Sequence, residues 1–571
     1  MRNSVAIGIF AFCAVLFGLL LILPIGWVIR GGFLDPEGNF TLEYIAGVFL
    51  NPIYAEGLLN SFLIAIGTTS LVCIIAIPLA WLANRFDFVG KRVFSSLILV
   101  PMILPPFVGA IGFQQIFGQF GSLNALLGIL DNPVDWLGDA RMGGVILLQA
   151  LGLYPIMYLN VAAALANIDP AMEEAAENLG CTGFTKFRRI TLPLIMPGLF
   201  AGGTIVFIWS FTELGTPLIL NYSRCTPVQV FNELKDISTN PFPFALVFVM
   251  LTASVLLYLT GKLLFGRKAY AMQSKAATVS LSRPATGLRG AMVLLPFVLV
   301  TGIALLPHFG VILTAFSTPG SWYQTVFPQV LTMDNFSEAL GHQSTISSIQ
   351  NSLTFSLLAV LGNCVVGIAI AMVVVRSNLK IRWILDTLAM LPLAVPGLVM
   401  AFGFLAISSY LSKQEMVRES AWLDALVNVQ TNPTLFLVLA YSIRRLPYMV
   451  RSAVAGLQQT SVTLEEASAN LGATPWTTLR RITLPLITAN LIAGAMLAFS
   501  FSMLEVSDSL MLAQQAEYYP ITKTIYELFQ LIGTGKYLAS ALGVWAMVFL
   551  AATIIGASMI LGKKLGAIFR A

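Results

Sequence analysis

Two polar segments of closely similar sequence are the parts of this chain best suited to bind another molecule. The first, EEAAENLGCTGFTKFRRITLPLIMPGL, covers residues 173–199, and the second, EEASANLGATPWTTLRRITLPLITANL, covers residues 465–491. Seventeen of the 27 positions are identical, at an offset of 292 residues. Each copy places glutamates and small residues shortly before a glycine, a pattern that predicts a short helix with a defined end.

The residues around the first copy predict where this helix begins and ends. Asp169 followed by Pro170 is typical of a helix start, because aspartate caps free N–H groups and proline fits the first turn. Gly180 is typical of a helix end, where the backbone takes a positive φ. Glu173 and Glu177 point away from the face that carries small or apolar side chains, namely Ala175, Ala176 and Leu179.

The second copy repeats these features. Ser461 is the expected cap, Gly472 the expected end, and the small face carries Ala467, Ser468 and Leu471. A short helix with a small face and exposed glutamates suits docking into a groove on another protein, because small side chains let backbones approach closely. The alternative is an amphipathic loop resting on a membrane. That alternative does not explain why glycine, an arginine pair and proline recur in register.

The composition excludes an ordinary soluble enzyme. Of 571 residues, 57% are hydrophobic and 10% are charged, whereas soluble domains carry roughly 25% charged residues. The chain is therefore expected to be an all-α integral membrane protein. Its two histidines argue against a histidine-rich metal or haem site, and its five scattered cysteines are expected to be packing residues.

Twelve apolar runs are long enough to span a membrane as helices, which need about 20 apolar residues each. They lie at about residues 5–29, 58–83, 93–117, 143–166, 193–217, 244–266, 290–316, 351–375, 383–408, 433–455, 485–513 and 537–562. The first run is longer than the apolar part of a signal peptide, and no cleavage site follows it. It is therefore expected to be the first membrane helix.

Lysine and arginine in the connecting segments predict the orientation, since they accumulate on the cytoplasmic side. With the N-terminus inside, the inner segments hold 22 of the 32 Lys and Arg residues and the outer segments hold eight. Both termini and both polar segments are then expected in the cytoplasm. The expected location is the cell (inner) membrane, with lipid as a partner and no nucleic acid.

The repeat extends beyond the polar segments. LVPMILPPFVGAIGF at residues 99–113 matches MLPLAVPGLVMAFGF at residues 390–404, and the Asn-Ser pair at residues 60–61 recurs at residues 351–352. We therefore expect two tandem six-helix repeats, at residues 1–265 and 289–571. Residues 266–288 are basic, rich in Ser and Ala and without a span, which predicts a cytoplasmic linker.

The doubled segment resembles the signature of permease subunits of ABC importers, E-A-A-x-x-x-G-x9-I-x-L-P. The first copy matches it at Glu174, Ala175, Ala176, Gly180, Ile190, Leu192 and Pro193. The second matches it, after Glu465, at Glu466, Ala467, Ser468, Gly472, Ile482, Leu484 and Pro485, with one serine in place of alanine. The resemblance covers essentially the whole chain. It is to the fused, double-length branch typified by ferric-iron permeases, with related members for thiamine and phosphonates.

This resemblance implies a type I ABC importer permease fold and a set of partners. In that family each motif loop forms a coupling helix that fits a cleft in a cytoplasmic ATPase, so two ATPase copies are expected on this chain. ATP and Mg²⁺ are expected on those subunits, and no cofactor on this chain. ATP binding would switch the two halves from inward-facing to outward-facing, and hydrolysis would reset them. The short outer loops imply a separate extracytoplasmic solute-binding protein.

One Gly-Lys pair superficially suggests a nucleotide site in the chain itself. Gly535 and Lys536 stand in LIGTGKY, but Gln530 and Tyr537 occupy the places where a phosphate-binding loop has glycine and Ser or Thr. This segment is therefore not expected to bind nucleotide. The chain is not expected to be an enzyme.

Ionisable residues within apolar spans are costly and usually functional, and five of them are candidates here. Glu213 corresponds to Glu505 at the 292-residue offset, Asp508 lies nearly one turn beyond, and Arg444 and Arg445 lie near the middle of the tenth span. They could line the translocation path as an ionic gate or solute contact, where carboxylates would suit a hard cation such as Fe³⁺. Alternatively, they form an interhelical salt bridge, for instance Glu505 with Arg444. No metal site is certain.

Prolines are expected to break or kink the third and ninth spans. Pro101 and Pro105 in one half, and Pro392 and Pro396 in the other, each remove a helical hydrogen bond. Such repeat-related breaks often flank a transport pathway. The alternative is a kink that serves packing alone.

Three functional classes can be compared. An ABC importer permease explains the spans, the repeat and the docking motifs. A twelve-helix secondary transporter leaves the docking motifs unexplained, and a membrane scaffold leaves the paired helix breaks unexplained. Ferric iron is the expected solute by resemblance alone. Thiamine, a phosphonate, a polyamine or an inorganic anion remains open, because specificity resides mostly in the binding protein.

Overall fold

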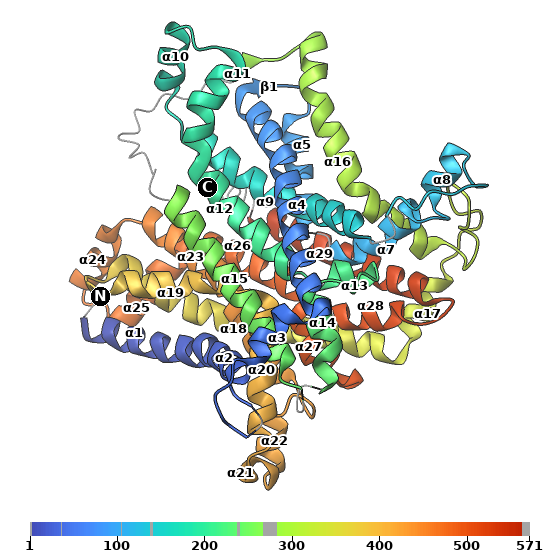
Figure 1. Cartoon of the computed structure of the whole chain (residues 1–571). Helices are drawn as coiled ribbons and strands as arrows, with labels where there is room; N and C mark the ends of the chain where they lie inside the picture. Colours follow the sequence, from blue (N-terminus) through green and yellow to red (C-terminus); the bar gives the residue numbers. More distant parts are fainter. Residues whose placement is uncertain are drawn as a thin grey trace. The chain divides into compact units, whose positions relative to one another are not determined.

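The computed structural model describes residues 3–35, 37–103, 106–137, 141–236, 240–265 and 283–561. Almost all regular structure in these residues is helical (Figure 1). The strands found there are β1 (Phe86–Asp87) and β2 (Arg283–Pro284), which pair in parallel. An all-α architecture is therefore confirmed.

The helices of the first half are α1 (Asn3–Phe17), α2 (Leu23–Phe33), α3 (Glu43–Leu50), α4 (Pro52–Arg85), α5 (Lys91–Leu97), α6 (Val100–Ile103), α7 (Pro106–Phe117), α8 (Ser122–Leu127), α9 (Met142–Ala166), α10 (Pro170–Asn178), α11 (Gly183–Lys186), α12 (Leu192–Thr212), α13 (Gly215–Ile219), α14 (Thr226–Asn232) and α15 (Phe242–Phe265). Shorter helical turns are η1 (Gly18–Ile22), η2 (Phe187–Thr191) and η3 (Glu233–Asp236).

The helices of the second half are α16 (Gly287–Phe316), α17 (Asp334–Gly341), α18 (Gln343–Arg376), α19 (Arg382–Ala394), α20 (Gly397–Leu411), α21 (Glu415–Arg418), α22 (Ala421–Val427), α23 (Thr434–Gln459), α24 (Val462–Asn470), α25 (Pro475–Thr478), α26 (Leu484–Met503), α27 (Ser507–Leu512), α28 (Ile521–Phe529) and α29 (Gly535–Leu561). Shorter turns are η5 (Leu479–Thr483) and η6 (Ala516–Tyr518).

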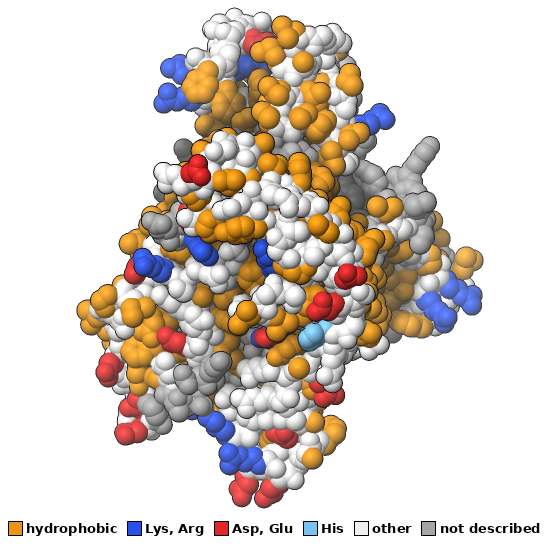
Figure 2. Space-filling model, turned by 90° about the vertical axis from the view of Figure 1, so that its right-hand side faces the viewer, with side chains coloured by type: hydrophobic (Ala, Val, Ile, Leu, Met, Phe, Trp, Pro, Cys, Tyr) orange, Lys and Arg blue, Asp and Glu red, His pale blue; other side chains and the backbone are white. Residues whose placement is uncertain are grey.

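Every predicted span coincides with a helix or an interrupted helix. Within the described residues, nine helices are long and apolar enough to cross a membrane, and two bent helix pairs bring the number to eleven. The predicted span at 433–455 is α23, which is long enough but carries Arg444, Arg445 and Arg451. Hydrophobic side chains are abundant on the surface (Figure 2), as expected where lipid is the solvent.

The chain forms two compact units, and each unit contains segments of both halves. Unit 1 comprises Met1–Asn51, Val230–Leu251 and Phe336–Ala571, whereas unit 2 comprises Pro52–Gln229 and Thr252–Asn335. The first helices of each half therefore belong to the unit formed mainly by the other half. The predicted repeat boundaries at residues 265 and 289 stay predictions, since residues 266–282 lie outside the described residues.

Each unit has the same internal packing. In unit 2, α4, α9 and α12 pack against one another and α16 packs on α7; in unit 1, α18, α23 and α26 pack together and α2 packs on α20. These elements correspond at the repeat offset, α4 to α18, α9 to α23, α12 to α26 and α7 to α20. The sequence repeat is therefore also a repeat of tertiary packing within each unit.

Glycines allow the close contact between the interrupted helix and the helix that covers it. A Cβ added to Gly310 of α16 would lie 2.6 Å from the Gly112 carbonyl oxygen of α7. In unit 1, a Cβ on Gly403 of α20 would lie 2.8 Å from Pro24 of α2. A side chain at either glycine would separate the two backbones, which explains glycine at both places.

The helix breaks lie beside some of the predicted prolines. α19 continues through Pro392 and ends at Ala394, and α20 starts after Pro396 at an angle of 97°. Pro101 lies inside the short helix α6, and Pro105 lies outside the described residues. The break in the ninth span thus lies before Pro396, which has no N–H with which to continue the hydrogen bonds of α19. Its suggested place beside a transport path stays a prediction.

Candidate functional site: two repeated loops and a buried ionic cluster

α10, in unit 2, has the ends that the sequence predicts. The Asp169 carboxylate accepts a hydrogen bond from the Ala171 N–H at 2.9 Å, which caps the first turn. At the other end Gly180 has a φ of +78°, and the Cys181 N–H donates to the Ala176 carbonyl at 2.9 Å. This is a glycine helix end, in which N–H groups beyond the helix return to its last turn.

α24, in unit 1, is built in the same way. Ser461 Oγ accepts a hydrogen bond from the Thr463 N–H at 3.2 Å. Gly472 has a φ of +83°, and the Ala473 N–H donates to the Ser468 carbonyl at 3.1 Å. The two polar segments therefore fold into matching helix–turn loops, which we call the α10 loop (residues 169–191) and the α24 loop (residues 461–483).

The first glutamate of the α10 loop is bound within its own unit. Glu173 forms an ion pair with Arg85, the last residue of α4. Its other carboxylate oxygen accepts a hydrogen bond from Thr191 Oγ1 at 3.1 Å. The glutamate thus ties the loop to the helix before it and to the start of the helix after it, which fixes the direction in which α10 projects.

The first glutamate of the α24 loop makes the equivalent contacts. Glu465 pairs with Arg376 Nε at 3.0 Å and accepts a hydrogen bond from Thr483 Oγ1 at 3.4 Å. Arg376 also donates to the carbonyls of Leu457 and Thr460 at 3.0 and 3.1 Å. From the sequence, Arg85 and Arg376 were only basic residues of the inner segments, and their pairing with the glutamates was missed. The available signal was that both end a long apolar run and lie 291 residues apart.

The second glutamate of each loop faces outward, next to an exposed leucine. Glu174 and Glu466 are exposed. Leu179 is 87% exposed and Leu471 is 89% exposed, each immediately before the glycine that ends the helix. Large apolar side chains that are almost fully exposed at matching places in two polar loops indicate a surface that meets another molecule.

An aromatic side chain extends this surface in both loops. Phe184 is 76% exposed and Trp476 is 68% exposed, and they lie at equivalent positions 292 residues apart. Sequence reasoning missed both; the recurrence of an aromatic residue in a polar loop was the available signal. We refer to Glu174, Ala175, Leu179 and Phe184, and to their counterparts Glu466, Ala467, Leu471 and Trp476, as the outer faces of the two loops.

The predicted small face is only partly correct. Ala175 and Ala467 are exposed, as predicted, but Ala176 and Ser468 are buried. Ser468 Oγ lies 2.9 Å from Thr478 Oγ1 within its own loop. The second small residue of each copy therefore serves internal packing, because the return of the chain after the glycine covers that side of the helix.

One ion pair distinguishes the α10 loop from the α24 loop. The buried Lys186 Nζ lies 2.5 Å from Glu177 Oε1. The hydrogen bond and charge of Lys186 lower the pKa of the Glu177 carboxyl below its ordinary value. The α24 loop has Ala469 and Thr478 at these positions. The charge arrangement behind the two loops therefore differs, although their outer faces match.

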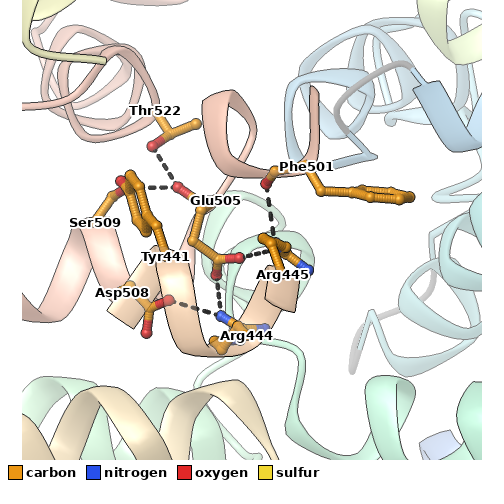
Figure 3. A network of polar contacts seen from close by, with 8 residues as sticks. All are labelled: Tyr441, Arg444, Arg445, Phe501, Glu505, Asp508, Ser509 and Thr522. Atoms are coloured by element: carbon orange, nitrogen blue, oxygen red, sulfur yellow. Dashed lines mark hydrogen bonds and ion pairs between the residues drawn. The ribbon is translucent and has the colours of Figure 1, made fainter. Parts of the chain in front are cut away.

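Four of the five predicted intramembrane charges form one cluster in unit 1 (Figure 3). Arg444 pairs with Glu505 and also with Asp508, where Nη1 and Oδ2 are 2.9 Å apart. Arg445 pairs with the other Glu505 oxygen and donates to the Phe501 carbonyl at 3.2 Å. The cluster holds two positive and two negative charges, so the buried ions neutralise one another.

The cluster connects helices that are far apart in the sequence. Glu505 lies in the break between α26 and α27, and its carbonyl accepts a hydrogen bond from Thr522 Oγ1 of α28 at 2.7 Å (Figure 3). The Arg444 guanidinium lies against Gly397, the first residue of α20, where an added Cβ would clash with it. The predicted contact between Glu505 and Arg444 is present. Whether these charges also meet a solute stays a prediction.

Glu213, the fifth charge, has a different environment in unit 2. It lies in the break between α12 and α13, where its carboxylate accepts hydrogen bonds from the Thr216 N–H at 2.9 Å and from Gln149 Nε2 at 3.3 Å. No ion pair to Glu213 is formed among the residues that the structure describes. The positions equivalent to Arg444 and Arg445 are Gly152 and Leu153.

The repeated Asn-Ser pair secures the segment that follows each break. In unit 2, Asn60 Nδ2 donates to the Arg224 carbonyl at 2.9 Å, and Ser61 Oγ accepts from the Thr226 N–H at 2.9 Å. Thr226 is the first residue of α14. Ser61 of α4 therefore caps the N-terminus of α14.

The same contacts recur in unit 1. Asn351 Nδ2 donates to the Glu517 carbonyl at 2.8 Å, and Ser352 Oγ accepts from the Ile521 N–H at 2.7 Å. Ile521 begins α28, the helix whose Thr522 contacts Glu505. The sequence showed the repeated pair, but its role depends on residues about 165 positions away and could not be predicted from it.

A preformed metal cluster is not seen in the described part of the chain, where no group of three or more His, Cys, Asp or Glu side chains is arranged to hold a metal ion. Glu505 and Asp508 are engaged by arginines, and Glu213 belongs to the other compact unit. A role of these three carboxylates as metal ligands therefore stays a prediction.

Comparison with known proteins gives two matches to one family. Residues 74–270 and residues 363–563 each match the family described as binding-protein-dependent transport system inner membrane component. The first match contains the α10 loop and the second contains the α24 loop. The tandem repeat predicted from the sequence is therefore confirmed.

Several relatives align over both halves. The ferric transport system permease protein FbpB of Actinobacillus pleuropneumoniae is 27% identical over 483 residues, which cover 81% of this chain and 64% of that protein. The Fe(3+)-transport system permease protein FbpB 2 of Haemophilus influenzae is 27% identical over 508 residues, covering 87% of this chain and 88% of that protein. This chain thus spans slightly less than two thirds of the length of the Actinobacillus protein.

A shorter relative aligns over less of the chain. The probable molybdenum ABC transporter permease protein HVO_B0370 of Haloferax volcanii is 29% identical over 248 residues, which cover 43% of this chain and 86% of that protein. The relatives therefore carry names that refer to different solutes.

Proposed function

Because the chain belongs to the family of binding-protein-dependent transport system inner membrane components, we propose that it is the permease subunit of an ABC importer. The observation that carries this proposal is the pair of matching outer faces on the α10 and α24 loops. Each presents an exposed glutamate, an exposed leucine and an exposed aromatic ring. Two alike surfaces on one chain suit two copies of the same partner.

The partner is a cytoplasmic ATPase that binds one copy at each loop. Burial of Leu179 and Leu471 in clefts of the two ATPase subunits would remove apolar surface from water, which favours association. The contacts of Glu173 with Arg85 and of Glu465 with Arg376 hold each loop to a membrane helix. A movement of the docked ATPase would therefore be transmitted to α4 and α18.

Transport proceeds by alternating access. ATP binds the closed ATPase dimer better than the open one, so it shifts the permease toward the state that this dimer favours, and hydrolysis removes the bias. ATP and Mg²⁺ belong to the partner subunits, and this chain binds no cofactor and hydrolyses nothing. Both termini and both loops lie in the cytoplasm, and the protein resides in the inner membrane.

The solute is ferric iron, delivered by an extracytoplasmic binding protein. The support is the names of the two double-length relatives. Thiamine, a phosphonate or another small solute is the alternative, since a family relative is named for molybdenum. A secondary transporter is the alternative of another class, and it predicts no ATPase on the loops.

The ATPase proposal is tested by reversing charge on the outer faces. The variant carrying Glu174→Arg and Glu466→Arg is extracted in mild detergent and examined by native mass spectrometry. We expect the parent chain to carry two copies of one ATPase and the variant to lose both. The matched control carries Glu37→Arg and Glu419→Arg, two exposed glutamates outside the loops, and should keep both copies.

Two outcomes would refute this proposal. An unchanged set of partners in the loop variant would leave the loops as surfaces that rest on lipid. Uptake that is abolished by a protonophore, but is insensitive to vanadate and needs no ATPase, would favour the secondary transporter. The solute is tested separately by uptake of radiolabelled ferric iron in cells with and without the chain, in competition with thiamine, molybdate and spermidine.

A further inference from the structure

Two turns occupy matching places in the halves of the chain. One follows α2 in unit 1 and comprises residues 33–35 and 37–43, and the other follows α16 in unit 2 and comprises residues 316–334. Each is closed by an antiparallel bridge, between Leu34 and Phe40 and between Ser317 and Leu331. We call these two segments the outer turns.

A threonine fixes the backbone of the outer turn in unit 1. The Thr41 N–H donates a hydrogen bond to the Phe33 carbonyl at 2.8 Å. Thr41 Oγ1 accepts a hydrogen bond at 3.1 Å from the N–H of Glu43, the first residue of α3. Phe40 and Leu42 flank the threonine and are 70% and 55% exposed.

The outer turn in unit 2 is built in the same way. The Thr332 N–H donates to the Phe316 carbonyl at 2.7 Å, and Thr332 Oγ1 accepts from the Asp334 N–H at 3.0 Å. Leu331 and Met333 flank this threonine and are 64% and 68% exposed.

The exposed apolar pair is therefore part of the repeat. Phe40 corresponds to Leu331 and Leu42 corresponds to Met333, both at an offset of 291 residues. Large apolar side chains that are exposed in pairs at matching places of two turns indicate a surface that meets another molecule.

The helices before the outer turns are long enough to cross a bilayer completely. α16 has 30 residues, and the candidate span Ser4–Phe33, which ends with α2, also has 30. At 1.5 Å per residue each is about 45 Å long, which matches the thickness of roughly 40–45 Å that a bilayer has with its headgroups. The outer turns therefore lie at the level of the headgroups.

The helices after the outer turns show which side of the membrane this is. α4 and α18 are candidate spans that begin shortly after the two turns. Both end at an arginine that pairs with a polar loop, Arg85 with Glu173 and Arg376 with Glu465. One crossing of the membrane thus separates each outer turn from a loop.

The outer turns follow helices that already face lipid. α16 exposes Leu299, Ile303 and Phe309, and the first span exposes Leu19 and Ile22. These apolar side chains meet acyl chains, because the helices that carry them cross the bilayer. The exposed pairs of the outer turns extend this lipid-facing surface to the headgroup level.

We propose that the two outer turns are membrane anchors. Their exposed apolar pairs insert among the lipids at the headgroup boundary of the leaflet opposite the α10 and α24 loops. Removal of four large apolar side chains from water favours this position, and shallow insertion is typical of apolar side chains on segments that lie on a membrane. A lipid surface is favoured over a soluble partner because the turns directly follow lipid-facing helices.

Such anchors would fix the depth at which α3 and α17 begin. They would also leave the exposed apolar pairs unavailable to an extracytoplasmic protein, which would then bind other segments on that side. This inference goes beyond the proposed function and does not rest on it, since contact with lipid requires neither an ATPase nor transport.

The test is the accessibility of spin labels on the full chain in vesicles of phosphatidylethanolamine and phosphatidylglycerol. The five native cysteines are replaced by alanine, and Leu42→Cys or Met333→Cys introduces a single label. Electron paramagnetic resonance compares collisions of the label with oxygen, which concentrates in lipid, and with a water-soluble nickel chelate. We expect collisions with oxygen to exceed those with the chelate at both positions.

The matched controls are Glu37→Cys and Glu338→Cys, which label exposed polar positions close to the two turns. Collisions with the chelate should exceed those with oxygen at both. If the labels at Leu42 and Met333 meet the chelate as often as the control labels do, the apolar pairs lie in water and the proposal is wrong. Lipid contact at only one turn would also contradict it, because the two turns are matched.

A second measurement keeps the native cysteines. A benzophenone-bearing phenylalanine replaces Phe40 or Leu331, and the vesicles are irradiated. We expect mass spectrometry to find phospholipid attached at both positions, and none when the same residue replaces Glu37 or Glu338. Absence of attached lipid at Phe40 and Leu331 would overturn the proposal and leave these surfaces free for a soluble partner.

Discussion

Glu213 and Glu505 occupy the same place in the two halves, but their charges are balanced differently. Glu505 is paired with Arg444 and Arg445, whereas Glu213 is surrounded by neutral donors from Gln149 and Thr216. The arginines are replaced by Gly152 and Leu153 in the first half. The repeat therefore offers an internal comparison of a buried carboxylate with and without a built-in cation.

Glu505→Gln is expected to destabilise the protein by about 3–5 kcal/mol, because it leaves the buried Arg445 without its counter-charge. Glu213→Gln should cost about 1 kcal/mol or less, since only hydrogen bonds to neutral donors change. Unfolding of both variants in detergent measures the difference.

The control for this comparison is Asp386→Asn. The half-buried Asp386 pairs with the exposed Arg451 at 3.3 Å, and loss of a pair that is open to water on one side costs about 1 kcal/mol. Equal stability of Glu505→Gln and Asp386→Asn would show that the cluster does not hold its elements together. A loss of uptake in Glu213→Gln at unchanged stability would support a contact between Glu213 and the solute.

At the scale of elements, each interrupted helix depends on a serine from a distant helix. Ser61→Ala and Ser352→Ala each leave a buried N–H, of Thr226 and Ile521, without its acceptor. The expected cost is about 1–3 kcal/mol for each variant. Hydrogen exchange should rise at the start of α14 in the first variant and at the start of α28 in the second.

The matched control is Ser96→Ala, since the Ser96 hydroxyl donates to the Arg92 carbonyl on the exposed face of α5. It should leave exchange in α14 and α28 unchanged. If exchange rises equally throughout the chain in the Ser61 and Ser352 variants, the two serines contribute general stability and do not secure one helix each.

A second prediction at this scale concerns α16, the helix that packs on α7. Gly310→Leu should destabilise unit 2 by at least about 1–3 kcal/mol, because the new side chain meets the α7 backbone. Gly302→Leu on the same helix is the control, since an added Cβ there meets no atom within 4 Å. Comparable melting temperatures for the two variants would contradict the described contact of α16 with α7.

At the scale of the whole molecule, each compact unit is assembled from both sequence repeats. Unit 1 contains the first 51 residues with most of the second half, and unit 2 contains residues 252–335 with most of the first half. Neither half carries all the helices of either unit.

A chain divided within residues 266–282 tests this arrangement. We expect the two halves expressed together to copurify, and each half expressed alone to be degraded or aggregated, because helices that cover α7 and α20 are then missing. A division inside α9, after residue 154, should fail even on co-expression. A stable, monodisperse single half would contradict the exchange of first helices between units.

The sequence by itself determined the class of protein, the tandem repeat, the position of most membrane helices and the ends of α10 and α24. These features are local: hydropathy over about 20 residues marks a span, and a cap or a glycine marks a helix end within one turn. The family resemblance of the doubled motif also required only short segments, and the two family matches confirm it.

The sequence suggested the pair of Glu505 with Arg444, but only the tertiary structure decided the other charge contacts and which surfaces stay exposed. Glu173 meets Arg85 across 88 positions, and Glu505 meets Arg445 across 60, separations that no helical periodicity encodes. For the same reason the burial of Ala176 could not be predicted, since it depends on how the chain returns after Gly180. Whether a residue lies in a helix or at its end depends on its neighbours in the sequence. The residue that it contacts depends on how elements far apart in the chain pack together.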